Sequence, residues 1–401
     1  MRLVHLADLH LGFRQYQRLT ATGINQREAD VAKTLQQAVA QVIEVAPDVI
    51  VIGGDIFHTV RPSNPAILHA YRVLLRLREQ LPDTPIIMVA GNHDAPRTAE
   101  TGCILRLFRE IGVHVADAQA ELFAFPSLSL AVLAVPDVPG VERPAFDPPE
   151  GYQHKVLLLH GEIAGVLPEH AASADRAAIE IKPEELNAER WSYVALGHFH
   201  VYREVAPRAY YSGSLDYTSS NPWGELQEER ERRVPGKGFI EQDLVSGAHR
   251  FHPVAPARVL LDLEPVDASG MGAQELDGAI RARVDSAPGG IDQRIVRVTV
   301  RNVARHVVRE LDHGALREYR KRATHFHLDT RRPEPLPRRS GHGSSTAGGA
   351  RRATLPELVG ERLRERPLPA GVDREQFVTL GLRYLQQAED AVMAAMPVVE
   401  G

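Results

Sequence analysis

The sequence predicts an α/β protein built as a four-layer sandwich, in which two mixed β-sheets pack together and are flanked by helices. A small α+β domain and a C-terminal helical tail are expected to follow it. Two observations predict this fold. Short apolar runs alternate with amphipathic helical patterns over residues 1–255, a pattern typical of sheets covered by helices. The chain also has 401 residues, which is too long for one core.

Five apolar runs in the first predicted domain (1–255) are bounded by glycine or polar residues, so we interpret them as buried strands. They span residues 3–7, 49–52, 86–90, 156–159 and 193–196. Helices are expected from Asn25 to Ala46, and from Ser63 as the cap to Leu81. Two further runs, 128–135 and 239–244, are interpreted as strands of a second sheet.

The second predicted domain (256–330) alternates strands and helices on a smaller scale. Strands are expected at 258–263, 294–300 and 325–329, and helices at 273–284 and 308–322. Residues 331–354 are rich in Arg, Pro, Gly and Ser, a composition that cannot bury a core and predicts a flexible linker.

The tail (355–401) is expected to hold two helices, at 355–365 and 374–396. The second carries an apolar stripe at helical spacing, made of Phe377, Leu380, Tyr384, Leu385 and Ala388. Such a stripe is normally covered. The pattern leaves open whether it docks on the chain's own first domain or on a partner.

The composition is ordinary for a globular protein, with 43% apolar and 25% charged residues. The single cysteine, Cys103, excludes an intrachain disulfide and is expected in a helix and in the core. We expect a cytoplasmic protein with no signal segment and no membrane span. The net charge is −5, but residues 296–355 hold 14 Lys and Arg against 5 Asp and Glu, or +9. This indicates either an anionic partner or a solvated Arg-rich surface.

Side chains that can bind metals directly follow each of the five predicted strands. They form the blocks Asp8-Leu9-His10, Gly54-Asp55, Gly91-Asn92-His93, His160-Gly161 and Gly197-His198-Phe199-His200. In an open α/β sheet, ligands gather outside the carboxyl ends of the strands, so residues distant in sequence should converge. Merely structural polar residues would account poorly for the complete ordered set, because buried charge needs a partner.

The donor set combines carboxylate, imidazole and amide groups, which suits Mn, Fe or Zn better than Ca or Mg. Two divalent ions about 3.5–4 Å apart can clamp the attacking and leaving oxygens of a phosphoryl displacement. A carboxylate shared by both ions would reduce their mutual repulsion. The sequence therefore predicts a two-metal phosphoesterase.

The five blocks resemble the calcineurin-like metallophosphoesterase superfamily and, more narrowly, the SbcD family of DNA double-strand-break repair nucleases. The narrower resemblance rests on the opening segment 5–12, on His58 three residues after Asp55, and on Asp94 after the third block. The segments 211–215 and 237–239 also resemble turns that close that nuclease domain. It covers residues 1–255 by motif and 256–330 by architecture, and it does not account for residues 225–235.

The resemblance implies two divalent metal ions, and manganese is their expected identity. One would be held by Asp8, His10, Asp55 and His200. The other would be held by Asp55, Asn92, His160 and His198, so that Asp55 bridges the two. His93 would face the leaving oxygen as an acid or transition-state stabiliser, oriented by Asp94, and His58 would contact the scissile phosphate.

The resemblance also implies a function in DNA end processing and repair. The chain would act as an exonuclease on duplex ends and an endonuclease on single strands or hairpins. It would form a homodimer within a heterotetramer with an SbcC-type coiled-coil ATPase, gripped by the tail, while residues 256–330 would be a capping domain that positions DNA. Two alternatives stay open: a small-molecule phosphodiesterase or phosphatase, and a non-catalytic tether of DNA ends.

Overall fold

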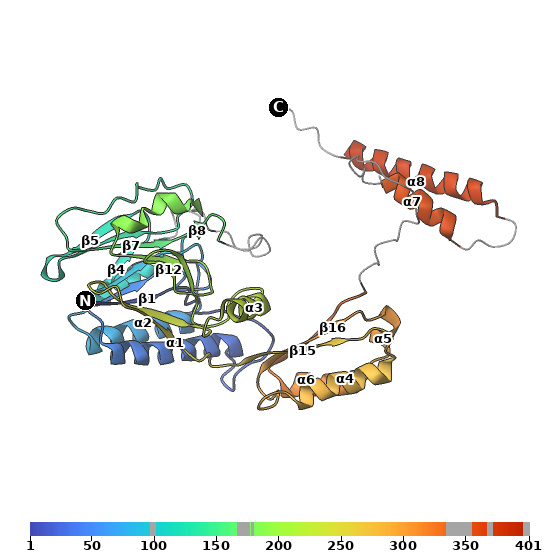
Figure 1. Cartoon of the computed structure of the whole chain (residues 1–401), viewed down its shortest axis with the longest axis horizontal. Coiled ribbons are helices and arrows are strands. Elements are labelled where there is room, and N and C mark those ends of the chain that lie inside the picture. Colours follow the sequence, from blue (N-terminus) through green and yellow to red (C-terminus); the bar gives the residue numbers. More distant parts are fainter. Residues whose placement is uncertain (97–101, 167–176, 178–179, 334–354, 367–371, 396–401) are drawn as a thin grey trace. The chain divides into compact units, whose positions relative to one another are not determined.

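The computed structural model divides the chain into two compact units, Met1–Glu334 and Pro335–Gly401 (Figure 1). The structure describes residues 1–96, 102–166, 177, 180–333, 355–366 and 372–395. No helix within these ranges is both long and apolar enough to cross a membrane.

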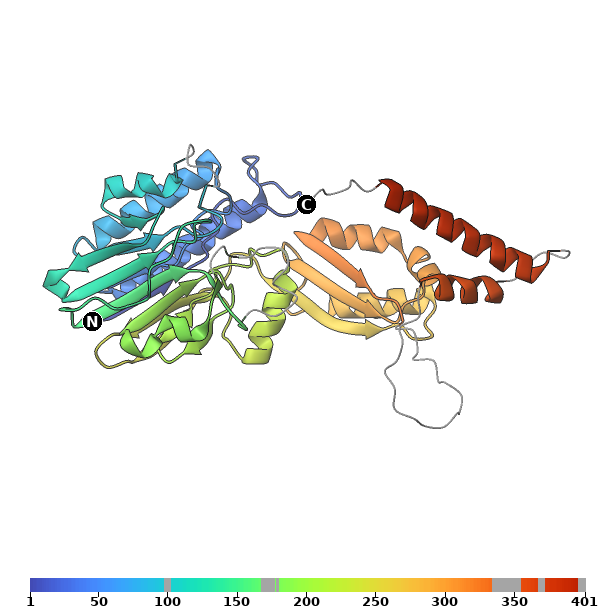
Figure 2. The same ribbon diagram turned by 90° about the horizontal axis from the view of Figure 1, so that it is seen from above.

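Two six-stranded mixed sheets form the body of the first unit (Figure 2). The first sheet has the order β14-β13-β1-β2-β3-β4 and the second the order β11-β12-β10-β7-β6-β5. The strands of the first are β1 (Arg2–Leu6), β2 (Val49–Ile52), β3 (Ile86–Val89), β4 (His114–Ala116), β13 (Gly238–Asp243) and β14 (His249–Pro253). Those of the second are β5 (Glu121–Phe125), β6 (Leu130–Val135), β7 (His154–His160), β10 (Tyr193–Gly197), β11 (Arg203–Ala206) and β12 (Ala209–Tyr211).

The centres of both sheets are parallel. Antiparallel pairing occurs at both edges of the second sheet, through β11 and β5, but at only one edge of the first, through β13 and β14, because β4 pairs parallel with β3. All five predicted strands that precede a ligand block are present, and the predicted sandwich is confirmed. One assignment was wrong: the run 239–244 joins the first sheet, where β13 pairs antiparallel with β1. Phe239 packs on the outer core and Ile240 on the core between the sheets. A strand whose apolar side chains point to both faces can pair within either sheet. Its sequence pattern therefore does not predict which strand it pairs with.

Helices cover the outer face of the first sheet, as Figure 1 shows for α1 (Gln26–Val45) and α2 (Asn64–Gln80). Ser63 caps α2 as predicted, and Asn25, predicted as the start of the first helix, is its cap; each side chain accepts a backbone N–H in the first turn. Cys103 is buried as predicted, but it precedes a 3₁₀ helix, η1 (Ile104–Ile111), instead of lying in an α-helix.

The outer face of the second sheet has a thinner cover. It consists of the 3₁₀ helices η3 (Pro183–Leu186) and η4 (Ala188–Arg190) and the short strands β8 (Glu162–Ile163) and β9 (Glu180–Ile181). Their side chains bury Trp191 against the sheet. A further 3₁₀ turn, η2 (Pro126–Leu128), explains why β6 starts two residues later than predicted.

The two sheets are joined by an apolar layer, and a histidine is buried at it. His5 of β1 is fully buried, and its Nδ1 lies 3.1 Å from the hydroxyl of Tyr193 on β10. Burial lowers the pKa of His5 to about 3, because a desolvated imidazole resists protonation. Close packing of this layer holds the strand ends of both sheets at one edge.

A smaller domain with its own sheet follows. We call residues 260–330 the cap. It has three parallel strands, β15 (Leu260–Asp267), β16 (Ile295–Arg301) and β17 (His325–Thr330). Helices α4 (Ala273–Asp285) and α6 (His313–Arg322) pack on one face, with α5 (Arg305–Arg309) beside them. The predicted helix 308–322 is interrupted: Asp312 accepts the backbone N–H groups of Gly314 and Ala315 and so starts α6 afresh.

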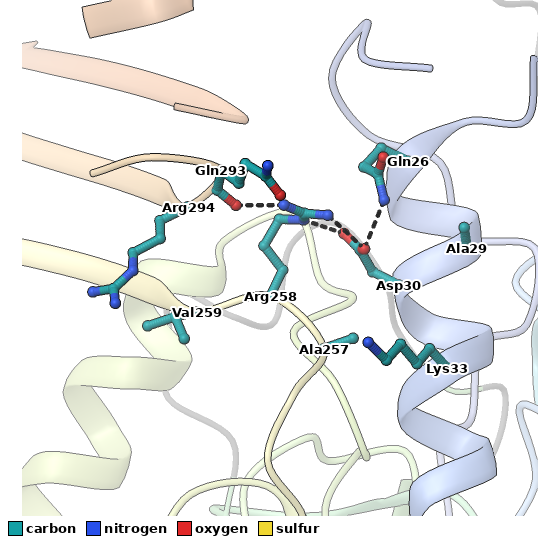
Figure 3. Close-up of a pocket in the computed structure, with 9 residues that line it drawn as sticks. All are labelled: Gln26, Ala29, Asp30, Lys33, Ala257, Arg258, Val259, Gln293 and Arg294. Carbon is teal, nitrogen blue, oxygen red and sulfur yellow. Dashed lines mark hydrogen bonds and ion pairs between the residues drawn. The ribbon is translucent and has the colours of Figure 1, made fainter. Parts of the chain in front are cut away.

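Charged contacts fix the cap to the sandwich. Arg258 donates to both carboxylate oxygens of Asp30 on α1, at 2.6 and 2.9 Å, and also to the carbonyl of Gln293 (Figure 3). These residues border a cavity of about 350 Å³ between α1 and the cap. Farther along, Arg18 donates to the carbonyls of Arg320 and Ala323 at the end of α6, both at 2.9 Å.

Helix α3 (Pro222–Arg232) also touches the cap. The guanidinium of Arg297 on β16 lies 4.9 Å from the ring centroid of Trp223 on α3. Leu226 packs with Leu260 and Ile295 of the cap. The segment that the family resemblance left unexplained is thus largely this helix.

The second unit contains α7 (Leu355–Glu365) and α8 (Arg374–Ala395), which pack together. Val378 of α8 is buried, whereas Leu380 and Tyr384 are 45% and 63% exposed. The predicted apolar stripe therefore leaves part of its surface uncovered within the described residues. The predicted linker from residue 334 onward, and the side chain of Ala388, lie outside those residues.

Candidate metal centre

The five predicted ligand blocks converge at one edge of the sandwich. The loops after β1 and β2 are joined by hydrogen bonds from His10 N to Asp55 O (2.8 Å) and from Leu11 N to Ile56 O (2.9 Å). The sheets are joined where Asp8 accepts the backbone N–H of His198, at 2.9 Å. The sequence predicted that the ligand blocks would meet in a crevice at the end of one sheet. They lie instead where the ends of both sheets meet.

The first candidate metal position lies among Asp8, His10 and His200. Their donor atoms all lie within 4.8 Å of one another. The Nε2 atoms of His10 and His200 are 3.0 Å apart. Two imidazole nitrogens at that distance can share only one proton, whereas a divalent cation accepts a lone pair from each. The donor set thus fits a metal.

The second candidate position lies around His160. Its Nε2 is 2.9 Å from the side-chain oxygen of Asn92 and 3.6 Å from Oδ2 of Asp55. Its Nδ1 is 2.7 Å from the carbonyl of Gly53, which fixes the ring. The ring of His198 meets that of His160 edge-on, with centroids 5.4 Å apart. These are the four residues predicted for the second metal.

Asp55 lies between the two positions. Its Oδ2 is 3.6 Å from Nε2 of His10 and also 3.6 Å from Nε2 of His160. One carboxylate oxygen at equal distance from a donor of each group is the placement expected of a shared ligand. This geometry supports the predicted bridging role.

The electrostatics of the centre also favour a cation. Asp8 is fully buried, and burial raises its pKa to about 6. Burial, followed by the charges of His200, His93 and His58, holds the pKa of His10 well below its usual value. Desolvation opposes charge on these groups, and a bound cation reverses that balance for carboxylates. The buried acids thus have a physical need for a positive partner.

Four ligand residues adopt left-handed backbone conformations. The φ angles are +52° at Asp8, +45° at His10, +49° at Asp55 and +110° at His198. Such conformations cost roughly 1–3 kcal/mol each in residues other than glycine, and they cluster at functional sites. Here they turn each chain sharply after its strand, so that the side chain points toward the centre.

Two glycines of the ligand blocks are required by close approach. A Cβ on Gly91 would lie 2.1 Å from Oδ1 of Asp55, and one on Gly197 would lie 1.7 Å from the carbonyl oxygen of Gly53. A larger residue at Gly197 would push the two sheets apart, and one at Gly91 would displace the carboxylate of Asp55. This explains why glycine opens the third and fifth blocks.

His93 and His58 lie beside the first position. The backbone N–H of His93 donates to Oδ1 of Asp55 (3.0 Å), and its Nδ1 donates to the carbonyl of His58 (2.8 Å). Since a carbonyl only accepts, Nδ1 carries the hydrogen. The His93 ring stacks on that of His58 at 5.2 Å and meets His10 edge-on at 4.9 Å.

Asp94 differs from its predicted role of orienting His93. Its carboxylate accepts the backbone N–H groups of Ile56 (3.0 Å), Phe57 (2.9 Å) and Gly91 (3.1 Å). It therefore ties the second loop to the third, and the carbonyl of His58 orients His93 instead. Burial, followed by the charge of Asp55, raises the pKa of Asp94 to about 7. The spacing of side chains in the sequence could not reveal that a backbone carbonyl, that of His58, accepts from His93 and orients it.

Sequence reasoning missed Glu225, which approaches His200 from α3. The available signal was the spacing of Glu225 and Glu229, which places two carboxylates on one face of a helix. Both are buried, together with Lys237.

Comparison with known proteins adds the following. Residues 1–226 match the family described as calcineurin-like phosphoesterase. The chain is 26% identical over 257 residues to the DNA double-strand break repair protein Mre11 of Methanococcus maripaludis, which covers 61% of this chain and 63% of that protein. The protein of the same description from Methanocaldococcus jannaschii is 27% identical, covering 61% and 62%. That of Methanosarcina mazei is 24% identical, covering 79% and 55%. The chain thus spans about three fifths of the length of these relatives.

Proposed function

The chain belongs to the calcineurin-like phosphoesterase family, and from that premise we propose that it is a two-metal DNA nuclease of end processing and repair. The observation that carries this proposal is the position of Asp55, whose Oδ2 lies 3.6 Å from a donor nitrogen of each metal group. Relatives described as DNA double-strand break repair proteins support DNA as the substrate.

Each metal would be held by the residues that the sequence predicted. Asp8, His10 and His200 would hold one, Asn92, His160 and His198 the other, and Asp55 both. Bound divalent ions, manganese first among them, would neutralise charge on the phosphodiester and supply an activated water. The strained loops hold the ligands before the substrate arrives, so little reorganisation is needed during the reaction.

His93 would serve the leaving oxygen. Its Nδ1 is engaged by the His58 carbonyl, and its backbone N–H is held by Asp55. The ring is therefore fixed, and its Nε2 is the atom that can donate to, or hold a proton near, the reacting phosphate. His58 stacks on this ring and would contact the same phosphate.

The cap favours DNA over a small phosphodiester. Helix α6 presents Arg317, Arg320, Lys321 and Arg322, all exposed. A duplex offers a row of phosphates for such side chains, whereas a small molecule would not reach them. The expected activities are exonuclease action on duplex ends and endonuclease action on single strands or hairpins.

The tail would provide the partner contact. Leu380 and Tyr384 remain exposed on α8, and an apolar patch on a helix is suited to pairing with another helix. The proposed partner is an SbcC-type coiled-coil ATPase, in a heterotetramer that contains two copies of this chain in the cytoplasm.

The nuclease proposal is tested by incubating the purified chain and manganese with end-labelled linear duplexes, hairpins and an aryl phosphodiester. Degradation of both DNAs, abolished by EDTA and by Asp55→Ala, is expected. Hydrolysis of the aryl compound with both DNAs left intact would favour the small-molecule enzyme. DNA binding without hydrolysis of any substrate would favour the tether.

The tail proposal is tested by capture of the co-expressed coiled-coil ATPase. Truncation after Thr330 and the Leu380→Glu variant should both lose the ATPase, while manganese-dependent hydrolysis stays intact. Gln387→Glu, an exposed polar position on the same helix, is the matched control and should retain it. A truncated protein that melts much earlier, with capture retained by Leu380→Glu, would indicate docking on the chain's own sandwich.

A further inference from the structure

A buried cluster of charged side chains lies directly behind His200. It comprises Glu225 and Glu229 of α3, Lys237 before β13, and the hydroxyl of Tyr217. The Glu225 and Lys237 side chains are 9% and 1% exposed. Removing charges from water costs several kcal/mol per ion, so a cluster this deep needs a reason to exist.

Glu225 approaches the ring nitrogen of His200 that faces away from the metal position. Its Oε1 is 3.5 Å from Nδ1 of His200. Both atoms are buried, and neither has another hydrogen-bond partner among the residues that the structure describes. The other nitrogen of the ring, Nε2, faces His10 at 3.0 Å. Glu225 and the metal position thus lie on opposite sides of one imidazole.

Lys237 holds Glu225 in place. Its ammonium group pairs with Oε2 of Glu225, lies 3.1 Å from Oε1 of Glu229, and donates to the backbone carbonyl of His200 at 2.8 Å. Glu229 accepts the Tyr217 hydroxyl at 2.6 Å. The cluster therefore grips both the main chain and the side chain of the same ligand.

The charges of the cluster do not cancel. One ammonium faces two carboxylates, which leaves a net charge of about −1 beside His200 when all three are ionised. The corresponding nitrogen of His160 is at hydrogen-bond distance from the neutral carbonyl of Gly53 (2.7 Å), whereas Oδ1 of Asp8 lies farther from it, at 4.0 Å. The two metal positions thus differ in the group that supports a ligand histidine from behind.

We propose that Glu225 is a positioning residue for the metal bound by His200. It accepts the Nδ1–H of His200, fixes the tautomer that presents Nε2 to the metal, and adds negative charge to that position. Metal-binding histidines almost always donate their second N–H to such an acceptor, and removing the acceptor weakens metal binding by about 10–100-fold. The inference rests on the proposed metal centre and deepens it.

The test is titration of the metal-free full-length chain with Mn²⁺, with calorimetry as the measurement of binding. Glu225→Gln keeps the shape of the side chain but removes its charge. It should weaken one of two Mn²⁺ sites by about 10–100-fold and leave the other unchanged. Glu225→Asp, which keeps the charge but is too short to reach Nδ1, should weaken the same site and serves if Glu225→Gln does not fold.

Two matched controls isolate the contact. Glu229→Gln removes a carboxylate that is also buried and pairs with the same lysine but does not face His200, and it should weaken the site far less than Glu225→Gln. Glu231→Gln changes an exposed carboxylate on the same helix and should behave as wild type. Melting of the metal-free proteins measures any structural loss separately.

The outcomes separate this inference from the function on which it rests. A wild-type chain that binds no Mn²⁺ would overturn both. A wild-type chain with two sites, both unchanged in Glu225→Gln, would overturn only the role of Glu225. Equal weakening by Glu225→Gln and Glu229→Gln, with equally lowered melting temperatures, would assign the cluster a structural role and also overturn it.

Discussion

The metal edge of the sandwich and the cap place their charged residues in opposite ways. At the metal edge, Asp8, Asp55 and His160 are at most 2% exposed, and two of them occupy left-handed backbone. In the cap, charges form pairs nearer the surface, such as Arg322 with Asp292 (3.0 Å), whose side chains are 46% and 62% exposed. The two non-glycine residues of the cap with positive φ, Gln293 and Asn302, lie in connections between its strands and helices, and neither belongs to a ligand block.

This difference distinguishes residues held for binding and reaction from charged residues on the surface of the fold. Buried charge and strained backbone lower stability, so their concentration at one edge indicates a site held for binding and reaction. Exposed ion pairs contribute little to stability, about 0–1 kcal/mol. Substitutions at the metal edge should therefore change hydrolysis strongly, and substitutions on the cap surface should leave hydrolysis of a small phosphodiester intact.

Asp55→Ala should have the largest effect. Because one carboxylate serves both positions, its loss should release both metals and abolish all hydrolysis. Metal content measured by mass spectrometry, with Asp83→Ala as an exposed control, checks this. Two metals per chain and intact activity in Asp55→Ala would refute the shared-ligand geometry.

His93→Ala should reduce turnover by about 10²–10⁴-fold, the usual contribution of a positioned acid. Both metals and DNA binding should be retained, because His93 is expected to act on the phosphate and not on a metal. Turnover of an aryl phosphodiester, together with metal content, provides the measurement. Loss of a metal would show that the roles of Asn92 and His93 are assigned incorrectly.

His5→Gln should leave hydrolysis at pH 7 unchanged but reduce acid sensitivity. The unfolded chain protonates His5 below about pH 6.5, whereas the folded protein resists protonation down to about pH 3. Between these values the unfolded state binds more protons, so stability falls as the pH falls. Wild type should lose about 2 kcal/mol more than the variant between pH 7 and pH 5. Urea unfolding at both pH values measures this, and equal losses would refute the buried neutral state.

Replacing Arg317, Arg320, Lys321 and Arg322 with alanine should not affect hydrolysis of the small substrate. DNA binding should weaken at low salt, and the slope of log affinity against log salt should flatten by about 0.9 for each phosphate that is no longer neutralised. Lys321 and Arg322 already pair with Glu318 and Asp292, so Arg317 and Arg320 should account for most of the change. An unaltered salt dependence would leave α6 as a solvated face.

The ligand blocks were predictable because each is local. A polar side chain stands at the end of a strand or directly after it, so Asp8, Asp55 and His160 could be placed together without knowing the topology. The caps at Asn25 and Ser63 are local in the same way. Such features depend on a few consecutive residues, and the sequence contains all of them.

What could not be predicted depends on partners distant in sequence. Nothing in residues 239–244 states that β1 is their neighbour. His93 is oriented by a backbone carbonyl, which every residue carries and no sequence pattern marks. The proposed role of Glu225 depends on its contact with His200, which exists only because α3 lies beside that residue in the folded chain. These interactions are products of the tertiary fold.

Helix α3 carries one more consequence, because it touches two regions within a single turn. Trp223 meets Arg297 of the cap at 4.9 Å, and Glu225 meets His200 at 3.5 Å. A displacement of the cap that moves this turn also moves the carboxylate behind the ligand. Cap orientation and the affinity for the proposed manganese ions would then be thermodynamically linked, and linkage is reciprocal. If DNA shifts the cap, it changes manganese affinity by the same factor as manganese changes the affinity for DNA.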